Sequence, residues 1–100
     1  LELSTNGIFS IEDGAFRELA SLRELNLVSN EITFLTSGKF RGLIQLESLD
    51  LSDNEIATVS DLAFEEVVSL KRLELSGNRI SDLPQGVFSF AKYLEVLYLG

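Results

Sequence analysis

The sequence contains no cysteine and no histidine, and these two absences exclude several kinds of chemistry. Without cysteine there is neither a disulfide framework nor a thiol nucleophile, and without either residue there is no typical zinc site. The cellular compartment stays open, because a cysteine-free stretch can belong to a secreted protein. We therefore predict no catalytic residues, metal ligands or cofactors, and we do not expect an enzyme.

Basic residues and long apolar runs are also scarce. Lysine and arginine number 8 against 16 aspartates and glutamates, which gives a net charge of −8. This balance argues against binding nucleic acid or an anionic membrane surface, since both favour basic patches. No apolar stretch is long enough to insert into a membrane, and we expect no signal peptide, because repeat sequence begins at once.

A 24-residue repeat organises what is present. The segment Leu22–Asn30 returns as Leu46–Asn54 and again as Leu70–Asn78. We predict one array over residues 1–100, with three full repeats and a partial repeat at either end. A fixed period of this length is the signature of a solenoid.

The leucine spacing within each repeat predicts a short strand. Leu25 and Leu27 are two residues apart, so in an extended chain both point to one face. Successive strands must run parallel, because every repeat returns in the same direction. We expect strands near Glu24–Val28, Ser48–Ser52 and Arg72–Ser76, with partial ones at both ends, centred on residues 2–4, 25–27, 49–51, 73–75 and 97–99.

The return segments are too short for long helices. Asp13-Gly14, Ser37-Gly38 and Gln85-Gly86 indicate turns, and residues 15–19 and their equivalents fit one helical or 3₁₀ turn. Phenylalanine heads a column of inward positions at residues 16, 40, 64 and 88. The inward positions of the second repeat are Leu22, Leu25, Leu27, Ile32, Leu35, Phe40, Leu43 and Leu46.

The pattern L-x-x-L-x-L-x-x-N resembles the leucine-rich repeat family over essentially the whole chain. The repeat length, the phenylalanine column and the segment Leu83–Phe88 are similar to the animal extracellular class. That class includes Toll-like receptors, variable lymphocyte receptors and adhesion proteins. The resemblance implies an α/β solenoid, mostly β, right-handed and curved, with a parallel sheet on the concave face and short 3₁₀ or irregular segments on the convex face. It also implies an extracellular or cell-surface location and roles in innate immunity or cell adhesion.

The resemblance assigns the asparagine that ends each repeat motif to a structural ladder. Its members are Asn6, Asn30, Asn54 and Asn78. It also implies caps, which this sequence lacks. We expect an interior piece of a longer solenoid, with flanking repeats or caps in the parent chain and open apolar faces at Leu1 and at Leu94–Leu99.

The outward residues of the strands are the candidate binding surface, since they vary while the leucines do not. In the family this face usually binds protein. The expected set is Glu24, Asn26, Val28, Ser48, Asp50, Ser52, Asp53, Arg72, Glu74, Ser76, Val96 and Tyr98. Its acidic character favours a basic protein ligand. The alternatives are a solvated face without a partner, a structural spacer in a larger ectodomain, and an engineered scaffold.

Three weaker signals have simpler explanations. Asp50 and Asp53 lack the loop spacing of a calcium site. Asp50 and Glu74 come close because of the repeat, which does not make them a catalytic carboxylate pair. The aromatic residues outside the repeating columns are contact anchors or, more commonly, local packing on the back of the solenoid; they are Phe9, Phe34, Phe90 and Tyr93.

Overall fold

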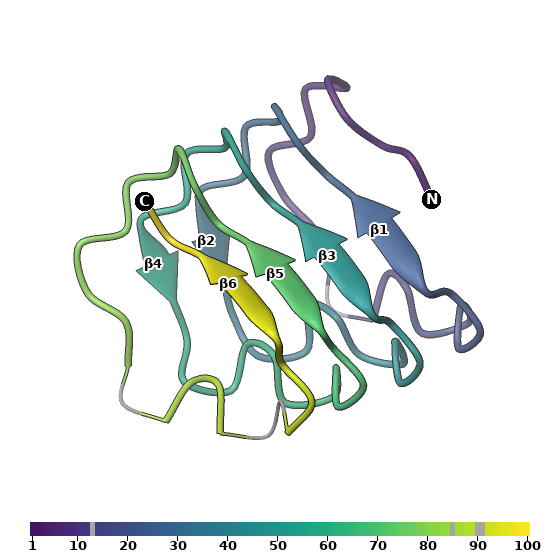
Figure 1. The fold of residues 1–100 in the computed structure, drawn as a ribbon. Helices are drawn as coiled ribbons and strands as arrows, with labels where there is room; N and C mark the ends of the chain where they lie inside the picture. Colours follow the sequence, from purple (N-terminus) through teal and green to yellow (C-terminus); the bar gives the residue numbers. More distant parts are fainter. Residues whose placement is uncertain (13, 85, 90–91) are drawn as a thin grey trace.

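Each circuit of the chain adds one strand to a parallel sheet in the computed structural model, which describes residues 1–12, 14–84, 86–89 and 92–100 (Figure 1). The strand order is β1-β3-β5-β6. Their bounds are β1 Glu24–Asn26, β3 Ser48–Asp50, β5 Arg72–Glu74 and β6 Val96–Tyr98. Glu2 joins the sheet through a single parallel bridge to Asn26. The predicted parallel solenoid is confirmed, and its strands pair with a register of one repeat.

The three complete strands begin at the predicted residues and end two residues earlier than predicted. Their centres are Leu25, Leu49, Leu73 and Leu97, and each strand has three residues. Backbone bonding nevertheless continues past the strand ends, since the Leu27 N–H donates to the Asp50 carbonyl at 2.8 Å. After β1 and β3 the chain bends early because Asn26 and Asp50 bind the backbone just beyond the strand, as described below.

The core lies on the side of this sheet toward which the strand leucines point, opposite the outward residues. All predicted inward positions of the second repeat are buried except Leu22, which is half-buried. Phe16, Phe40, Phe64 and Phe88 stack in a continuous column, with ring centroids 6.4, 5.7 and 5.9 Å apart. Because every ring contacts the rings of its neighbours, the repeats share one core.

A second, two-stranded sheet that the sequence did not predict lies behind the first (Figure 1). It consists of β2 (Phe34–Leu35) and β4 (Thr58–Val59), which run parallel. The Ser60 N–H donates to the Leu35 carbonyl at 2.8 Å and closes this pairing.

Two residues explain why this pairing does not extend to the neighbouring repeats. Pro84 stands 24 residues after Ser60 and has no N–H to donate. On the other side, the ammonium of Lys39 donates to the Ile11 carbonyl, which is the acceptor that further pairing with β2 would use. A proline and a lysine therefore limit the second sheet to two strands.

The remaining back segments are single turns rather than helices. Bonds between residues three apart, such as Arg17 N–H to Gly14 carbonyl at 3.1 Å, close them. Gly14, Gly38 and Gly86 have positive φ, while Asp13 and Gln85 of the expected turns lie outside the described residues. Across the described part of the chain, no helix is long and apolar enough to cross a membrane.

Candidate binding face

The asparagine that ends each full repeat motif lies on the buried side of the strands, and its side chain bonds to backbone groups. Asn54 shows the pattern. Its Oδ1 accepts from the Ile32 N–H at 3.1 Å, and its Nδ2 donates to the carbonyls of Leu27 and Leu51 at 2.9 and 3.0 Å. One side chain thus satisfies backbone groups of its own repeat and of the preceding repeat.

Asn30 and Asn78 repeat this arrangement. Asn30 Oδ1 accepts from the N–H groups of Asn6 and Ile8, and Asn78 Oδ1 accepts from the Ile56 N–H at 3.0 Å. Both amides also donate to carbonyls of the preceding repeat. Asn6 is exposed and enters the arrangement through its backbone N–H.

The other side of the same strands carries the outward residues. Pairing aligns Asn26, Asp50, Glu74 and Tyr98 in one column, with Glu2 beside Asn26. The exposed members of the candidate set are Glu24, Asp53, Arg72 and Tyr98. The half-buried members are Asn26, Val28, Ser48, Asp50, Ser52, Glu74, Ser76 and Val96.

Some outward side chains also shape the backbone, which the sequence analysis missed. Asp50 Oδ1 accepts from the Ser52 N–H at 3.0 Å and from the Ser52 hydroxyl at 2.6 Å. Asn26 accepts from the Val28 N–H at 2.9 Å in the same way. Such bonds from a short side chain to the second residue along form a local turn, and the Asp/Asn-x-Ser/Val spacing was the available signal.

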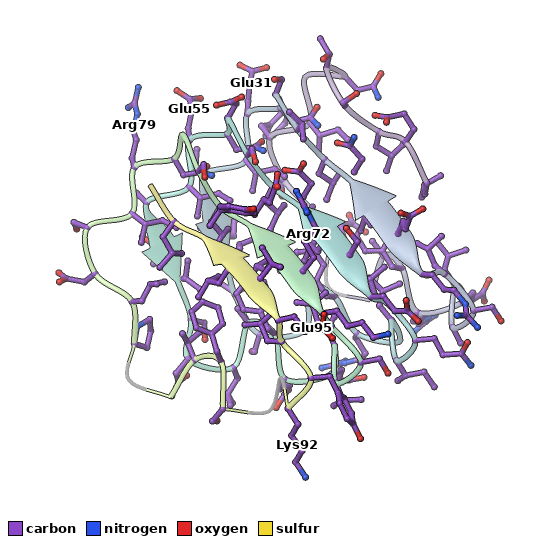
Figure 2. The ribbon with its side chains drawn as sticks, in the orientation of Figure 1. Glu31, Glu55, Arg72, Arg79, Lys92 and Glu95 are labelled. Carbon is purple, nitrogen blue, oxygen red and sulfur yellow. The ribbon has the colours of Figure 1, made fainter. Side chains whose placement is uncertain are left out.

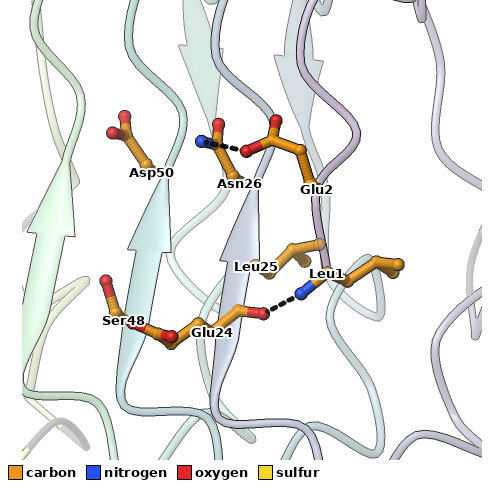
Figure 3. A pocket seen from close by; sticks show the side chains of 7 residues that line it. All are labelled: Leu1, Glu2, Glu24, Leu25, Asn26, Ser48 and Asp50. Atoms are coloured by element: carbon orange, nitrogen blue, oxygen red, sulfur yellow. Dashed lines mark hydrogen bonds between the residues drawn. The ribbon is translucent and has the colours of Figure 1, made fainter.

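The first repeats form an acidic hollow at one end of this face (Figure 3). Its volume is about 360 Å³ and its lining includes Glu2, Glu24 and Asp50. Asn26 Nδ2 donates to Glu2 Oε2 at 3.0 Å. Hydrogen bonds from the side chain and backbone of Ser4 lower the pKa of Glu2, so its carboxylate stays charged near neutral pH.

The other end of the face has a different chemistry. The guanidinium of Arg72 forms an ion pair with Glu74 and lies 5.4 Å from the centre of the Tyr98 ring. Half-buried Val96 lies beside Arg72 in the adjacent strand. This end is therefore electrically balanced and partly aromatic, whereas three carboxylates and the Leu1 ammonium line the hollow.

Asp53 lies in the bend after the strand rather than on the strand itself. Its φ is +56°, and its carboxylate covers Gly77, where an added Cβ would lie 2.1 Å from Asp53 Oδ1. Across the described residues, no group of three or more carboxylates is placed to hold a metal ion.

The off-column aromatic residues lie in different surroundings. Phe9 and Tyr93 are strongly exposed, while the ring of Phe34 is covered by the ammonium of Lys39 at 5.0 Å. Phe90 lies outside the described residues.

The family assignment follows from the sequence as well as the fold. The family model described as "Leucine rich repeat" matches residues 1–56, 21–80 and 44–100, which together span the chain. The chain belongs to the leucine-rich repeat family. The predicted family and fold class are confirmed. A comparison with curated protein sequences found no match.

Solved leucine-rich repeat structures superpose closely on this chain. A segment of TLR13, from its complex with ssRNA13, is 35% identical with a TM-score of 0.93, covering 99% of this chain and 14% of TLR13. A segment from the Drosophila Toll–Spatzle complex is 31% identical with a TM-score of 0.85, covering 93% of this chain and 12% of the other. The leucine-rich repeat domain of APL1B, at 23% identity and a TM-score of 0.91, shares the fold and is covered over 30% of its length.

Proposed function

We propose that this chain is a recognition segment of a cell-surface or secreted receptor and binds a protein through the outward face of its sheet. The observation that carries the proposal is the acidic hollow, where Glu2, Glu24 and Asp50 gather with no lysine or arginine among the lining residues. The positive group there is the Leu1 ammonium, which donates to the Glu24 carbonyl. Carboxylates arranged in this way attract basic groups and speed their encounter. The preferred partner is therefore a protein that presents lysine or arginine side chains.

Similarity to receptor segments supports this proposal. The Toll complex contains a partner named Spatzle and is described as a hub in development and innate immunity. The class that the repeat resembles is extracellular, so we place the chain at the cell surface or outside the cell. A role in innate immunity fits the Toll and TLR13 segments, whereas a role in adhesion rests on the sequence resemblance alone.

RNA is the competing ligand, because TLR13 was solved with single-stranded RNA. Because TLR13 is a similar leucine-rich repeat protein, the comparison does not support our expectation that this chain binds no nucleic acid. The charge of the outward face favours protein instead. Phosphates are bound by lysine and arginine. Among the outward strand residues the cation is Arg72, which is already paired with Glu74.

A spacer role is the second candidate. The chain spans 14% and 12% of the TLR13 and Toll chains, so a ligand of a whole receptor can contact other repeats. In that case, the outward face would bind neither a basic nor an acidic probe selectively.

The test compares two probes and two matched variants. A short oligolysine peptide and a single-stranded RNA are titrated against the chain, against Glu24→Gln/Asp50→Asn on the outward face, and against Glu31→Gln/Glu55→Gln away from it. Oligolysine should bind with an affinity that falls with salt, and the first variant should bind it about two- to thirty-fold more weakly. The second variant loses the same charge and should bind nearly as well as the parent chain. Preference for RNA, or equal losses in both variants, would overturn the proposal.

A further inference from the structure

The loops that lead into the strands carry an alternating row of charges. We term the side of the sheet at which the strands begin the strand-start edge; it is formed by these loops and not by an edge strand. The residues immediately before the strands are Arg23, Glu47, Lys71 and Glu95, each 24 positions after the last. Within the chain, Arg23 Nη1 lies 3.2 Å from Glu47 Oε2, and Lys71 Nζ lies 4.0 Å from Glu47 Oε1. Glu95 lies at the start of β6 (Figure 2).

This row is complementary to itself under a twofold rotation. If a second copy is turned so that the rows run antiparallel, Arg23 faces Glu95 of the other copy and Glu47 faces Lys71. The two rows have the same spacing, because neighbouring strands of a sheet are about 4.8 Å apart. A slip of one repeat would set Glu47 against Glu47, so like charges disfavour that register.

Apolar side chains on the same edge obey the same symmetry. Ile44 and Val68 lie three residues before Glu47 and Lys71 and are 48% and 43% exposed. The rotation that pairs Glu47 with Lys71 also sets Ile44 of each copy against Val68 of the other. Contact between them would remove from water an apolar stripe that the isolated chain leaves exposed.

A protruding ring and a hollow complete the match. Tyr93, two residues before Glu95, is 64% exposed. The position that the rotation places opposite Tyr93 is Ser21, which lines a hollow of about 410 Å³ formed by residues 18–22. An aromatic ring of one copy would therefore meet a concave site of the other at both ends of the contact.

The opposite edge of the sheet does not have this property. There the corresponding row is Gly7, Glu31, Glu55 and Arg79 (Figure 2). The same rotation would place Glu31 against Glu55 and bring two carboxylates together. The self-complementary pattern thus distinguishes one edge from the other within the same solenoid.

We propose that the strand-start edge is the interface of an antiparallel homodimer of this chain. The contact is isologous, since each patch meets its own copy. It goes beyond the binding function proposed above and does not depend on it, because it uses residues outside the candidate binding set.

Charge reversal in trans tests the pairing directly. Sedimentation equilibrium is measured for the parent chain, for Glu47→Lys, for Lys71→Glu and for an equimolar mixture of the two variants. Each variant alone should dimerise at least about tenfold more weakly, because two like-charge contacts replace two opposite ones. In the mixture all four facing pairs become opposite again, so dimers of one copy of each variant should return.

Two controls keep the result interpretable. Glu31→Lys makes the same charge change on the opposite edge and should leave dimerisation unchanged. Thermal unfolding of Glu47→Lys and Lys71→Glu checks that each variant is folded. A parent chain that stays monomeric, or a mixture that associates no better than its components, would overturn the proposal.

Disulfide trapping then fixes the register, because the sequence contains no cysteine. Ile44→Cys and Val68→Cys chains are oxidised separately and together. Cross-linking should be fastest in the mixture, since Ile44 faces Val68 of the other copy. Equal rates in all three samples would exclude the antiparallel register.

Discussion

The two sides of each strand repeat with the same 24-residue period but differ in how freely their residues vary. The inward column holds leucine at 25, 49, 73 and 97, whereas the outward column holds Asn26, Asp50, Glu74 and Tyr98. Inward residues must fit between two neighbours in a close-packed core, so a change in one repeat disturbs the next. Outward residues are constrained in a similar way only where they also bind the backbone, as Asp50 does.

The largest loss of stability should come from a substitution in the phenylalanine column. Phe64 is 1% exposed and its ring stacks between Phe40 and Phe88. Phe64→Ala should lower the free energy of unfolding by about 3–5 kcal/mol, the usual cost of such a cavity. Chemical denaturation measures the loss, and Phe64→Leu is the control that should restore part of it. A loss below that of Asp50→Ala would contradict the division between the two sides.

The second-largest loss of stability should come from the asparagine ladder. Asn54→Ala removes the acceptor of the Ile32 N–H. It also removes one of the two amide donors to each of the Leu27 and Leu51 carbonyls, which keep their bonds from Asn30 and Asn78. Leaving the buried Ile32 N–H without an acceptor should cost about 1–3 kcal/mol. The same denaturation experiment compares this variant with Asp50→Ala, and equal losses would mean that the ladder does not stabilise the stack more than an outward residue does.

The smallest effect sharpens the comparison, because it concerns an outward residue with a structural bond. Asp50→Ala removes the acceptor of the Ser52 N–H and the nearer of two acceptors of the Ser52 hydroxyl, and it should cost about 0.5–1.5 kcal/mol. Asp50→Asn keeps an oxygen at Oδ1 and should stay within about 0.5 kcal/mol of the parent chain. If both variants lose the same stability, the charge of Asp50 rather than its turn bond is what matters.

The sequence predicted the features that depend on the period. It identified the inward residues, the parallel direction and the phenylalanine column, because each follows from residue spacing alone. It missed the pairing of β2 with β4, because this pairing is confined to two repeats and is not part of the repeating pattern. Lys39 and Pro84 limit it, and each differs in chemistry from the residues at the same position of the other repeats. A repeat average hides such single substitutions.

The candidate site was predicted as a set of positions but not as an arrangement. Spacing places Arg72, Glu74 and Tyr98 on the outward side, yet their ion pair and ring contact depend on side-chain rotamers. The turn bond of Asp50 was missed for a related reason. An outward position was expected to face water, whereas Asp50 is half-buried against Ser52.

The asparagine ladder also gives the solenoid a mechanical direction. Asn30, Asn54 and Asn78 each hold the loop of the repeat before them. A pulling force that peels repeats from the C-terminal side therefore removes, with each repeat, the clamp on the next one. Peeling from the N-terminal side leaves every remaining clamp engaged, because the asparagine that holds a loop lies one repeat further along. A tether at one end of such an array would resist tension differently from a tether at the other.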